Sequence, residues 1–443
     1  MIYRNIIEEL KSWRASKYRK PLIIRGARQT GKTTVVREFG QTFTQFIYLN
    51  LERTEDAALF RSFPTFAHLV ASIFFHKDKN QQIADTLIFI DEIQEVPEAI
   101  NLLRYFYEDF PQYYVVAAGS LLETILKENV TMPVGRVQFM VLRPLAFDEY
   151  LGAMGEHAAL EQYHKTPMDD FAHTKLLQLF HNYALIGGMP EIVSHYAENR
   201  NLTALTPVYE SLLLAYMNDV EKYARNPNMV QIIRHVMTSM GPEAGNRIKF
   251  ERFGHSNYGS REVGEAMRIM EKAMLLSLIY PCTSTALPIF ADKKKSPRLQ
   301  LLDTGLLNYL AGIQKEVLGA DILEHAFQGK LAEHIVGQEL LAKRYSMIGE
   351  LHFWTRERKD AEAEIDFVHV EGANLIPVEV KSGATGRLRS LHQFMESAPH
   401  DTAVRFYGGT ISRDVIKMPS GKVFQLLSLP YYLAGRLSAY ILH

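Results

Sequence analysis

The stretch GARQTGKTT, residues 26–34, decides the fold of the first part of the chain. It fits the pattern G-x-x-x-x-G-K-[ST], with an apolar run at residues 22–24 before it and a segment after it that can continue as a helix. Glycines in such a bend let backbone N–H groups turn inward around phosphate oxygens, and the following helix adds the positive end of its dipole. The stretch therefore predicts a strand, a phosphate-binding loop and a helix in succession.

The side chains of this loop predict how ATP is held. Lys32 is expected to reach the β- and γ-phosphates, and the Thr33 hydroxyl is expected to help bind Mg²⁺. A glycine turn with a helix cap is the alternative for the same letters, but the strand–turn–helix context favours the phosphate loop. The residues expected to contact nucleotide are Gly26, Ala27, Arg28, Gln29, Thr30, Gly31, Lys32, Thr33 and Thr34.

A second motif, TLIFIDE at residues 86–92, is a continuous apolar run that ends in two acids. Such runs are typical of parallel strands covered on both faces, where ligands bind at the carboxyl ends of the strands. Asp91 is expected to contact Mg²⁺ through water, and Glu92 is expected to act as the base that orients the attacking water. The alternative is an acidic helix cap after a core strand.

Three further runs, at residues 46–51, 113–118 and 137–142, are predicted to be strands of the same sheet, with helical crossovers between them. Ser120 follows one of them, where it is expected either to sense the γ-phosphate or to cap a helix. Arg136 precedes the last strand. It is either an arginine finger, supplied by this chain or by a neighbouring subunit, or a solvated loop arginine. The predicted class is therefore α/β with a parallel sheet.

Four stretches of the chain resemble AAA+ ATPases, specifically a prokaryotic, archaeal-ATPase-like group in which a domain of unknown function usually follows. They are GARQTGKT, IFIDEIQEVPEAI, AAGSLLE and GRVQFMVLRPLAFDEYL. Two more stretches, YALIGGMPEIV at 183–193 and LLDTGLLNYLAG at 301–312, resemble recurring segments of that group. The resemblance implies a P-loop ATPase domain at residues 1–150. It also implies that the helical pattern at residues 151–225 is a lid over the nucleotide.

Residues 226–305 have the order helix, turn, helix and basic hairpin, which predicts a winged-helix-like module. Arg261 and Arg268 share one helix face that could meet DNA. Residues 293–295 and Arg298 are expected near the hairpin tip, as phosphate contacts. The alternative is an ordinary solvated surface, because glutamates share the second helix.

The C-terminal part, residues 306–443, contains a subtler pattern. Residues 364–383 alternate as two strands around a turn at 372–374, so that Glu379 and Lys381 point to the same face. Asp366 lies on the preceding strand. Glu333 falls on the apolar stripe of an upstream helix, where an unpaired carboxylate is costly unless it binds a partner or a metal.

The order helix glutamate, strand aspartate and E-x-K resembles PD-(D/E)XK nucleases and implies a restriction-endonuclease-like α/β domain. By this resemblance Asp366 and Glu379 would hold Mg²⁺ with help from Glu333, and Lys381 would stabilise the attacking hydroxide or the developing phosphorane charge. Alternating charges on a solvated hairpin produce the same letters, and related folds that only bind are also consistent with them.

Composition places the 443-residue chain among ordinary globular proteins of several domains, with 47% hydrophobic residues. Lys+Arg 49 against Asp+Glu 50 argues against a wholly basic surface but leaves room for a basic patch. The single cysteine, Cys282, excludes an internal disulfide and a cysteine-rich zinc site. We find no signal peptide and no membrane-spanning run, and so expect a cytoplasmic protein without a membrane partner.

These patterns lead to one main hypothesis and two rivals. The main hypothesis is an ATP-hydrolysing AAA+ protein whose nuclease-like domain acts on nucleic acid, DNA rather than RNA, under nucleotide control, with self-association to complete the ATPase site. The first rival is a switch that does not cleave and binds DNA or a protein partner. The second is a small-molecule kinase, which Glu92 disfavours because a base that activates water would waste ATP.

Overall fold

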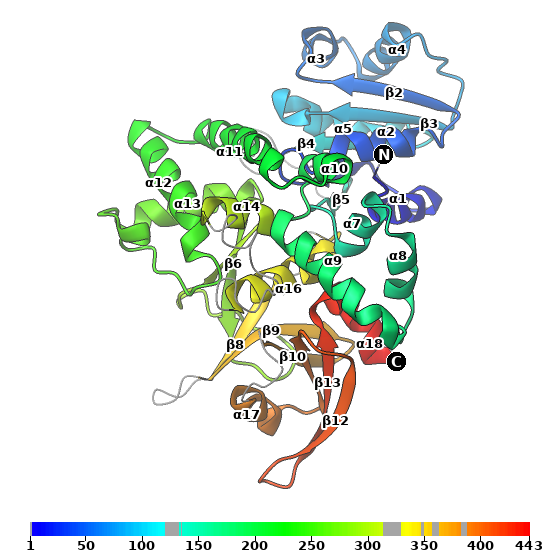
Figure 1. Ribbon diagram of the computed structural model, residues 1–443. Coiled ribbons are helices and arrows are strands. Elements are labelled where there is room, and N and C mark those ends of the chain that lie inside the picture. Colours follow the sequence, from blue (N-terminus) through cyan, green and yellow to red (C-terminus); the bar gives the residue numbers. More distant parts are fainter. Residues whose placement is uncertain are drawn as a thin grey trace.

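The computed structural model describes residues 2–119, 133, 135–312, 329–346, 350–356, 363–381 and 388–443. An α/β domain forms one end of the molecule and a second sheet forms the other, with helices between them (Figure 1). Ser120 lies outside the described residues, so its expected role stays a prediction. Within the described part, no helix is both long enough and apolar enough to cross a membrane.

The N-terminal domain contains a parallel sheet in the order β2-β3-β4-β1-β5. Its five strands lie at the places in the chain where the sequence predicts them, which confirms the expected parallel sheet. The elements are α1 (Ile6–Ala15), β1 (Leu22–Arg25), α2 (Lys32–Gly40), β2 (Gln45–Asn50), α3 (Thr54–Arg61), α4 (Phe66–His76), β3 (Thr86–Asp91), η1 (Ile93–Glu95), α5 (Glu98–Asp109), β4 (Tyr114–Gly119) and β5 (Gln138–Val141).

Strand β1 lies between β4 and β5, and helices cover both of its faces. Leu22 and Ile24 pack with residues of α1 and α2, whereas Ile23 packs on the other face with residues of α3, α4 and α5. All three side chains are fully buried. This burial on two sides explains why the run is continuously apolar. The phosphate loop follows directly, at the carboxyl end of β1.

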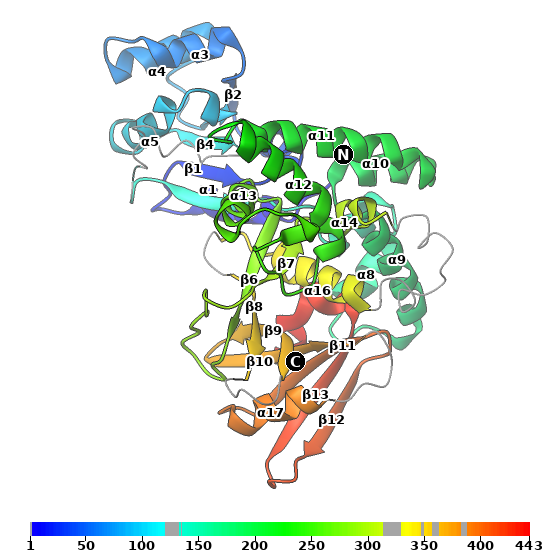
Figure 2. The same ribbon diagram turned by 90° about the vertical axis from the view of Figure 1, so that its left-hand side faces the viewer.

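A group of helices follows the sheet and confirms the expected helical pattern. They are α7 (Phe147–Ala153), α8 (His157–His164), η2 (Asp170–Ala172), α9 (His173–Ile186), α10 (Pro190–Asn199), η3 (Thr203–Leu205) and α11 (Thr206–Glu221), here called the lid. A sharp turn separates α9 from α10 at residues 187–189, within the GGMP stretch. In both views α11 lies beside the N-terminal sheet and borders α12 (Figure 1, Figure 2).

The remaining elements build a second, mixed sheet, in the order β12-β13-β11-β10-β9-β8-β6-β7. They are α12 (Pro227–Glu243), η4 (Phe253–His255), α13 (Ser260–Lys272), β6 (Leu276–Cys282), β7 (Arg298–Leu301), α14 (Thr304–Leu310), α16 (Lys330–Ala342), β8 (His352–Thr355), β9 (Glu364–Glu371), β10 (Asn374–Val380), α17 (Arg389–Ser397), β11 (Thr402–Tyr407), β12 (Ser412–Lys417), β13 (Val423–Pro430), η6 (Tyr431–Arg436) and α18 (Leu437–Leu442).

The hairpin β6–β7 differs from the independent wing that the sequence predicts. Helices α12 and α13 and the antiparallel hairpin occur in the expected order. However, β6 also pairs in parallel with β8, with Tyr280 opposite His352, so the hairpin shares one hydrogen-bonded sheet with the C-terminal part. Arg298, expected near the hairpin tip, is instead the first residue of β7, and its side chain is only 14% exposed.

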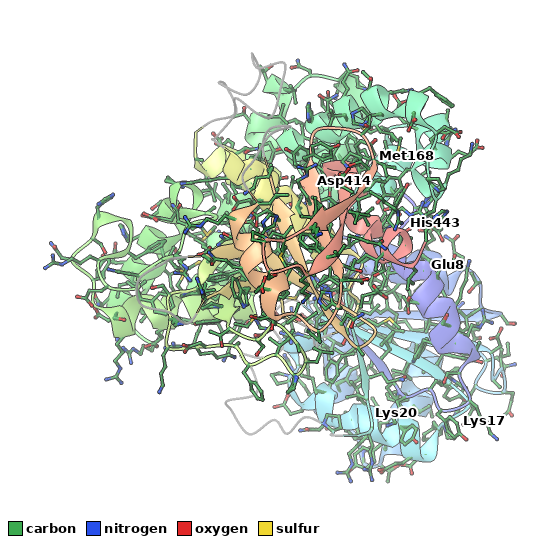
Figure 3. All side chains as sticks on the ribbon, turned by 90° about the horizontal axis from the view of Figure 1, so that it is seen from below. Glu8, Lys17, Lys20, Met168, Asp414 and His443 are labelled. Carbon is green, nitrogen blue, oxygen red and sulfur yellow. The ribbon has the colours of Figure 1, made fainter. Side chains whose placement is uncertain are left out.

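The C-terminal end of the chain packs against the lid. The backbone N–H of Met168 donates to the Tyr440 hydroxyl of α18 over 3.1 Å, and Arg436 donates to the Tyr163 carbonyl. Met168 and His443 accordingly lie on the same side of the molecule in Figure 3. The second sheet is thus joined to the lid through side chains of η6 and α18.

We expect Gly305→Ala to lower the melting temperature, because the added methyl group would overpack the contact between segments 183–193 and 301–312. A Cβ on Gly305, in the first turn of α14, would lie far inside contact distance of the Ile186 carbonyl oxygen and 2.8 Å from the Tyr209 hydroxyl oxygen. Overpacking of this kind costs about 1–3 kcal/mol. The matched control is Gly152→Ala in α7, where the nearest atom would be 3.9 Å away. Equal melting temperatures for the two variants would contradict this packing.

Candidate functional site

The phosphate loop has the geometry that its sequence predicts. Gly31 has φ +93°, a conformation that favours glycine, and α2 begins at the next residue. The Lys32 ammonium lies inside the bend and donates to the carbonyl oxygens of Gly26 over 3.0 Å and Ala27 over 2.8 Å. Burial lowers the pKa of Lys32 to about 8. A phosphate group in the bend would give this ammonium a charged partner in place of the carbonyls.

Thr33, Asp91 and Glu92 meet beside the loop, at the carboxyl end of β3. The Thr33 hydroxyl donates to Asp91 Oδ2 over 2.8 Å, and Tyr48 from β2 donates to the same oxygen over 3.1 Å. Burial raises the pKa of Asp91. Glu92 has φ 51°, an uncommon conformation for a non-glycine residue, and accepts a hydrogen bond from Gln94. The hydroxyl and the carboxylate therefore form the oxygen donor pair that Mg²⁺ prefers.

The lid is attached directly to the phosphate loop. Arg28 forms an ion pair with Asp219 of α11 at 2.9 Å, and the Tyr216 hydroxyl donates to the Arg28 carbonyl over 2.9 Å. From the other side, Arg4 donates to the Thr30 carbonyl over 2.8 Å and pairs with Glu149 of α7 at 3.1 Å. The helices α7 and α11 are therefore linked to the backbone of the loop, α11 directly and α7 through Arg4. The sequence carried no pattern that marks these partners.

Arg136 lies away from this chain's phosphate loop. It precedes β5, whose amino end is paired with the start of β1, whereas the loop follows the carboxyl end of β1. Its side chain is 52% exposed and forms an ion pair with Glu108 at 3.1 Å. An arginine-finger role can therefore be proposed only toward a neighbouring subunit.

A second group of charged side chains gathers on the C-terminal sheet. Helix α16 contributes Glu333, β9 contributes Glu364 and Asp366, and β10 contributes Glu379; these four are called the carboxylate cluster. Strands β9 and β10 form the expected antiparallel hairpin. Asp366 accepts a hydrogen bond from the Val380 N–H over 2.8 Å, and this holds it beside the end of β10.

The protonation of the cluster reflects its burial. Burial, reinforced by the charge of Asp366, raises the pKa of both Glu333 and Glu379. Lys381 contacts the Glu379 carboxylate; burial opposes its charge, but Glu379 and Asp366 outweigh this effect and raise its pKa. The other oxygen of Glu379, Oε2, is buried without a hydrogen-bond partner. This oxygen is suited to a cation.

Arg298 is the member of this site that sequence reasoning assigned to another role. Its guanidinium lies 3.3 Å from Asp366 and 3.7 Å from Glu333, and it also contacts Glu364. Within the residues that the structure describes, no set of three or more Asp, Glu, His or Cys side chains is arranged to hold a metal ion. Arg298 and Lys381 instead supply the cations of the cluster.

A buried hydrogen-bond network joins α16 to the helices that follow the N-terminal sheet. Glu339 of α16 accepts from the Phe147 N–H over 3.1 Å, and the Tyr183 hydroxyl lies within hydrogen-bond distance of both Glu339 Oε1, at 2.8 Å, and the Leu145 carbonyl oxygen, at 2.6 Å. Because α16 also carries Glu333, the helix of the carboxylate cluster is hydrogen-bonded to the lid and to the segment that follows β5.

The same network reaches the phosphate loop through the turn between α9 and α10. Asp303, which caps α14, accepts from the Gly188 N–H over 2.6 Å. Burial raises the pKa of Asp303 to about 6. Met189 Sδ of the turn lies 3.8 Å from the Tyr216 hydroxyl, which also donates to the Arg28 carbonyl of the phosphate loop. The turn thus lies between Tyr216, which contacts the phosphate loop, and Asp303 of the C-terminal half.

Glu339 gives the network a testable pH dependence. Burial raises the pKa of Glu339 from 4.5 to about 8, so between these values the folded state retains a proton that the unfolded chain has lost. Its contribution to stability is therefore present below about pH 4.5 and is lost as pH rises through about 8. We expect Glu339→Gln to flatten the fall in melting temperature between pH 5.5 and 8.5, by removing up to about 1.4 kcal/mol per pH unit.

The control for this measurement is Glu161→Gln, at an exposed position of α8. It is expected to keep the wild-type slope. A Glu339→Gln variant with the wild-type slope would show that Glu339 titrates normally in the folded protein.

Three matches to protein families cover most of the chain. Residues 18–151 match a family described as an AAA domain. Residues 177–317 match a domain of unknown function (DUF8612), and residues 328–432 match another (DUF4143). Among curated proteins, none matches the sequence significantly. The first part of the chain is therefore an AAA-type, phosphate-loop ATPase domain, which implies nucleotide binding.

The chain is also similar to several solved structures, at low identity. One is the Walker-type ATPase PABY2304 of Pyrococcus abyssi, with 13% identity, a TM-score of 0.45 and coverage of 70% of this chain and 96% of that one. Another is the ORC1 protein of Aeropyrum pernix in complex with DNA, with 15% identity, a TM-score of 0.27 and coverage of 71% and 92%. A third is PCH-2 of C. elegans, with 14% identity, a TM-score of 0.28 and coverage of 45% of this chain and 64% of that one.

Proposed function

We propose that this protein hydrolyses ATP and uses its nucleotide state to control a C-terminal, nuclease-like site that acts on nucleic acid, DNA rather than RNA. The observation that carries the proposal is the carboxylate cluster. Helix α16 and strands β9 and β10 carry Glu333, Asp366 and Glu379, and Lys381, directly after β10, contacts Glu379.

In the ATPase domain, each residue of the loop has a role that follows from its position. Lys32 would turn from the carbonyls of its own loop to the β- and γ-phosphates. Thr33 and Asp91 would hold Mg²⁺, which would help to neutralise the charge that develops on the phosphate. Glu92, next to Asp91, would orient the attacking water and accept its proton. Arg136 of a neighbouring subunit would complete the site in a homo-oligomer.

In the C-terminal domain, two carboxylates would hold one divalent cation once Arg298 is displaced. Asp366 and Glu379 would be the ligands, because both are buried and Glu379 Oε2 has no hydrogen-bond partner. A bound Mg²⁺ would lower the pKa of a ligated water. Lys381 would then stabilise the charge that develops on the phosphate, and Glu333, whose pKa is raised, would hold a proton near the site.

The lid provides the connection between the two sites. ATP binding would reposition Arg28 and, through its ion pair with Asp219, helix α11. The network around Glu339 would pass that movement to α16 and so to Glu333. The nucleotide state would thus change the position of Glu333 in the carboxylate cluster, although no ligand contacts both sites.

Cleavage of plasmid and single-stranded DNA in Mg²⁺ or Mn²⁺ tests this proposal. We expect Lys381→Ala to lower the cleavage rate by about 10²–10³-fold, because it removes a donor aimed at the developing charge. The matched control is Lys417→Ala, at an exposed position of edge strand β12 of the same sheet. Cleavage that is equal in the two variants would show that the activity arises elsewhere.

A second function, a nucleotide-controlled switch that binds DNA or a protein partner without cleaving, is favoured by Arg298. An arginine that contacts three of the four cluster carboxylates neutralises charges that a metal would otherwise neutralise. For this function, the cluster would hold the β6–β7 hairpin against the C-terminal sheet through Arg298, and Arg298 would stay in place of a metal ion.

Arg298→Ala distinguishes the two functions through its dependence on metal. Without Arg298 the buried carboxylates repel one another, so the variant is expected to melt several degrees lower in EDTA, and to regain that loss in millimolar Mn²⁺ if the cluster is a metal site. Arg247→Ala, which removes an ion pair with Glu364 and a contact with the Phe353 ring but no contact with Asp366, Glu333 or Glu379 within the described site, is the control. Loss without recovery in Mn²⁺ would support the switch.

A further inference from the structure

A row of polar side chains crosses the second sheet beside the carboxylate cluster. Asp366 of β9 accepts a hydrogen bond from the Val380 N–H of β10 over 2.8 Å. Glu379 of β10 is the register partner of Arg405 in the parallel strand β11, and Arg405 is in turn the partner of Ser428 in β13. Register partners project to the same face of a sheet, and neighbouring strands lie about 4.8 Å apart. Arg405 is therefore the next side chain along this face after Glu379.

Arg405 is a cation without a carboxylate partner among the residues that the structure describes. Its Nη2 donates to the Ser428 hydroxyl over 2.9 Å, and its guanidinium carbon lies 4.7 Å from the centre of the Tyr407 ring. Its Nε is buried without a hydrogen-bond partner. The neighbouring Glu379 carboxylate contacts Lys381 instead. The bond to Ser428 holds the Arg405 guanidinium on the β13 side, so its charge does not neutralise the cluster.

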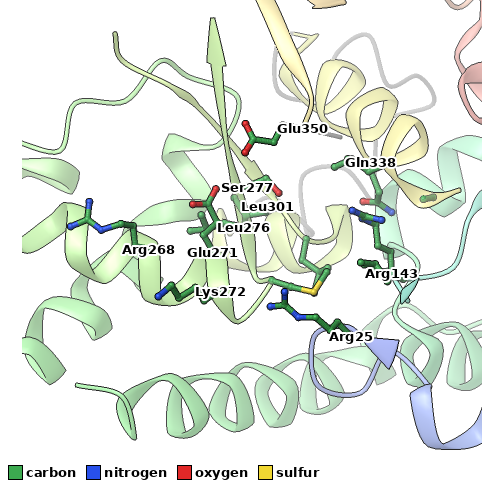
Figure 4. Close-up of a pocket in the computed structure, with 16 residues that line it drawn as sticks. Arg25, Arg143, Arg268, Glu271, Lys272, Leu276, Ser277, Leu301, Gln338 and Glu350 are labelled. Carbon is green, nitrogen blue, oxygen red and sulfur yellow. The ribbon is translucent and has the colours of Figure 1, made fainter. Parts of the chain in front are cut away.

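The basic side chains that line a cavity of about 380 Å³ between the ATPase domain, α13 and α16 are arranged differently. Arg268 and Lys272 point away from Arg25 and Arg143 in Figure 4, and two glutamates share the lining. These cations do not converge on one point, and acidic groups compete with an anion for them. Arg405 has no such competitor among the described residues.

The surroundings of Arg405 suit a phosphate group. The residue is half-buried, and a guanidinium that has lost part of its water without gaining a carboxylate is stabilised by an anion. Its planar fork of N–H donors matches the geometry of phosphate oxygens, which can accept two parallel hydrogen bonds. Ser428 is fully buried, so its hydroxyl orients the guanidinium and is not open to a ligand.

We propose that Arg405 binds a backbone phosphate of the nucleic acid, next to the phosphate that lies at the carboxylate cluster. This inference rests on the proposed function and adds a direction to it, because the nucleic-acid strand would run from the cluster across β11 toward β13. One phosphate would lie where Asp366 and Glu379 bind a cation, and the next would reach Arg405, one strand further. Such a contact fixes the position of the backbone and carries no base preference.

Salt-dependent binding of a fluorescein-labelled single-stranded DNA tests this role, measured by anisotropy on the full-length protein in EDTA so that no metal-dependent cleavage occurs. We expect Arg405→Gln to weaken binding about tenfold, because it removes charge-assisted hydrogen bonds. It is also expected to reduce the slope of log affinity against log salt by about 0.7, the amount for one phosphate contact on a single strand. A role confined to packing would leave that slope unchanged.

Two further variants control for folding and for general charge, with melting temperatures compared throughout. Arg405→Lys keeps the charge, so it is expected to keep the slope but to bind several-fold more weakly, because an ammonium lacks the planar fork. Arg413→Gln removes an exposed arginine of β12 whose register partner is Leu427, the neighbour of Ser428, so this arginine projects to the opposite face. It is expected to bind the DNA as the wild type does.

Cleavage by the same proteins in Mg²⁺ separates this inference from the proposed function. Wild-type affinity and slope in both Arg405 variants, together with cleavage by the wild type, would overturn the role of Arg405 and leave the proposed function standing. Weaker and less salt-dependent binding by Arg405→Gln, without cleavage by the wild type, would support the role of Arg405 and contradict the cleavage. No DNA binding by the wild type would overturn both.

Discussion

Lys32→Ala is expected to weaken ATP binding by at least about 100-fold and to abolish ATP hydrolysis. The Lys32 ammonium is buried inside the phosphate loop, and no other lysine lies in the described segment 22–40 to replace it. Two charge-assisted hydrogen bonds to phosphate oxygens contribute about 3 kcal/mol or more, which corresponds to this factor in affinity. Fluorescent-nucleotide titration and phosphate release measure the two quantities.

The control for Lys32→Ala is Lys17→Ala, at an exposed position at the outer edge of the ATPase domain (Figure 3). It is expected to bind and hydrolyse ATP as the wild type does. Because alanine also removes two internal hydrogen bonds of Lys32, the melting temperature without nucleotide must be compared as well. Tight ATP binding by folded Lys32→Ala protein would contradict the assignment of the phosphate loop.

Glu92→Gln is expected to separate ATP binding from ATP hydrolysis. Glutamine keeps the size of the side chain and the left-handed backbone that follows β3, but it cannot accept a proton from water. Loss of a general base typically costs about 10²–10⁴-fold in rate, while ATP affinity should change little. Single-turnover hydrolysis and equilibrium binding, measured on the same protein, test both parts of the expectation.

The control for Glu92→Gln is Glu95→Gln, three residues further along in η1 and exposed. It is expected to keep the wild-type hydrolysis rate. If Glu92→Gln hydrolyses ATP at the wild-type rate, the base lies elsewhere, and the kinase hypothesis regains support because its main objection is removed.

The ATPase sheet could be predicted from the sequence because its signals are local. Residues 22–24 are apolar on both faces, and Gly31 is required by the turn that follows them. The hairpin that carries Asp366 and Glu379 was predictable for the same reason, since strand alternation and a glycine turn lie within twenty residues. Glu333 could be placed because a carboxylate on an apolar stripe calls for a partner.

The contacts between distant segments could not be predicted in the same way. Arg298 lies in a basic stretch that is typical of a solvated hairpin, and only the pairing of β6 with β8 brings it to Glu364 and Asp366. The Arg28–Asp219 ion pair likewise joins residues whose own neighbours carry no signal. Side chains such as these depend on how whole elements dock, which periodicity and motif spacing do not encode.

The most direct test of the central claim is the dependence of DNA cleavage on ATP, measured with wild-type, Lys32→Ala and Glu92→Gln proteins in Mg²⁺. Our account predicts that wild-type cleavage depends on ATP and that Lys32→Ala loses this dependence. It also predicts that Glu92→Gln responds to ATP without hydrolysing it. Cleavage by the wild type at the same rate with and without ATP, or no cleavage by protein that still hydrolyses ATP, would contradict it.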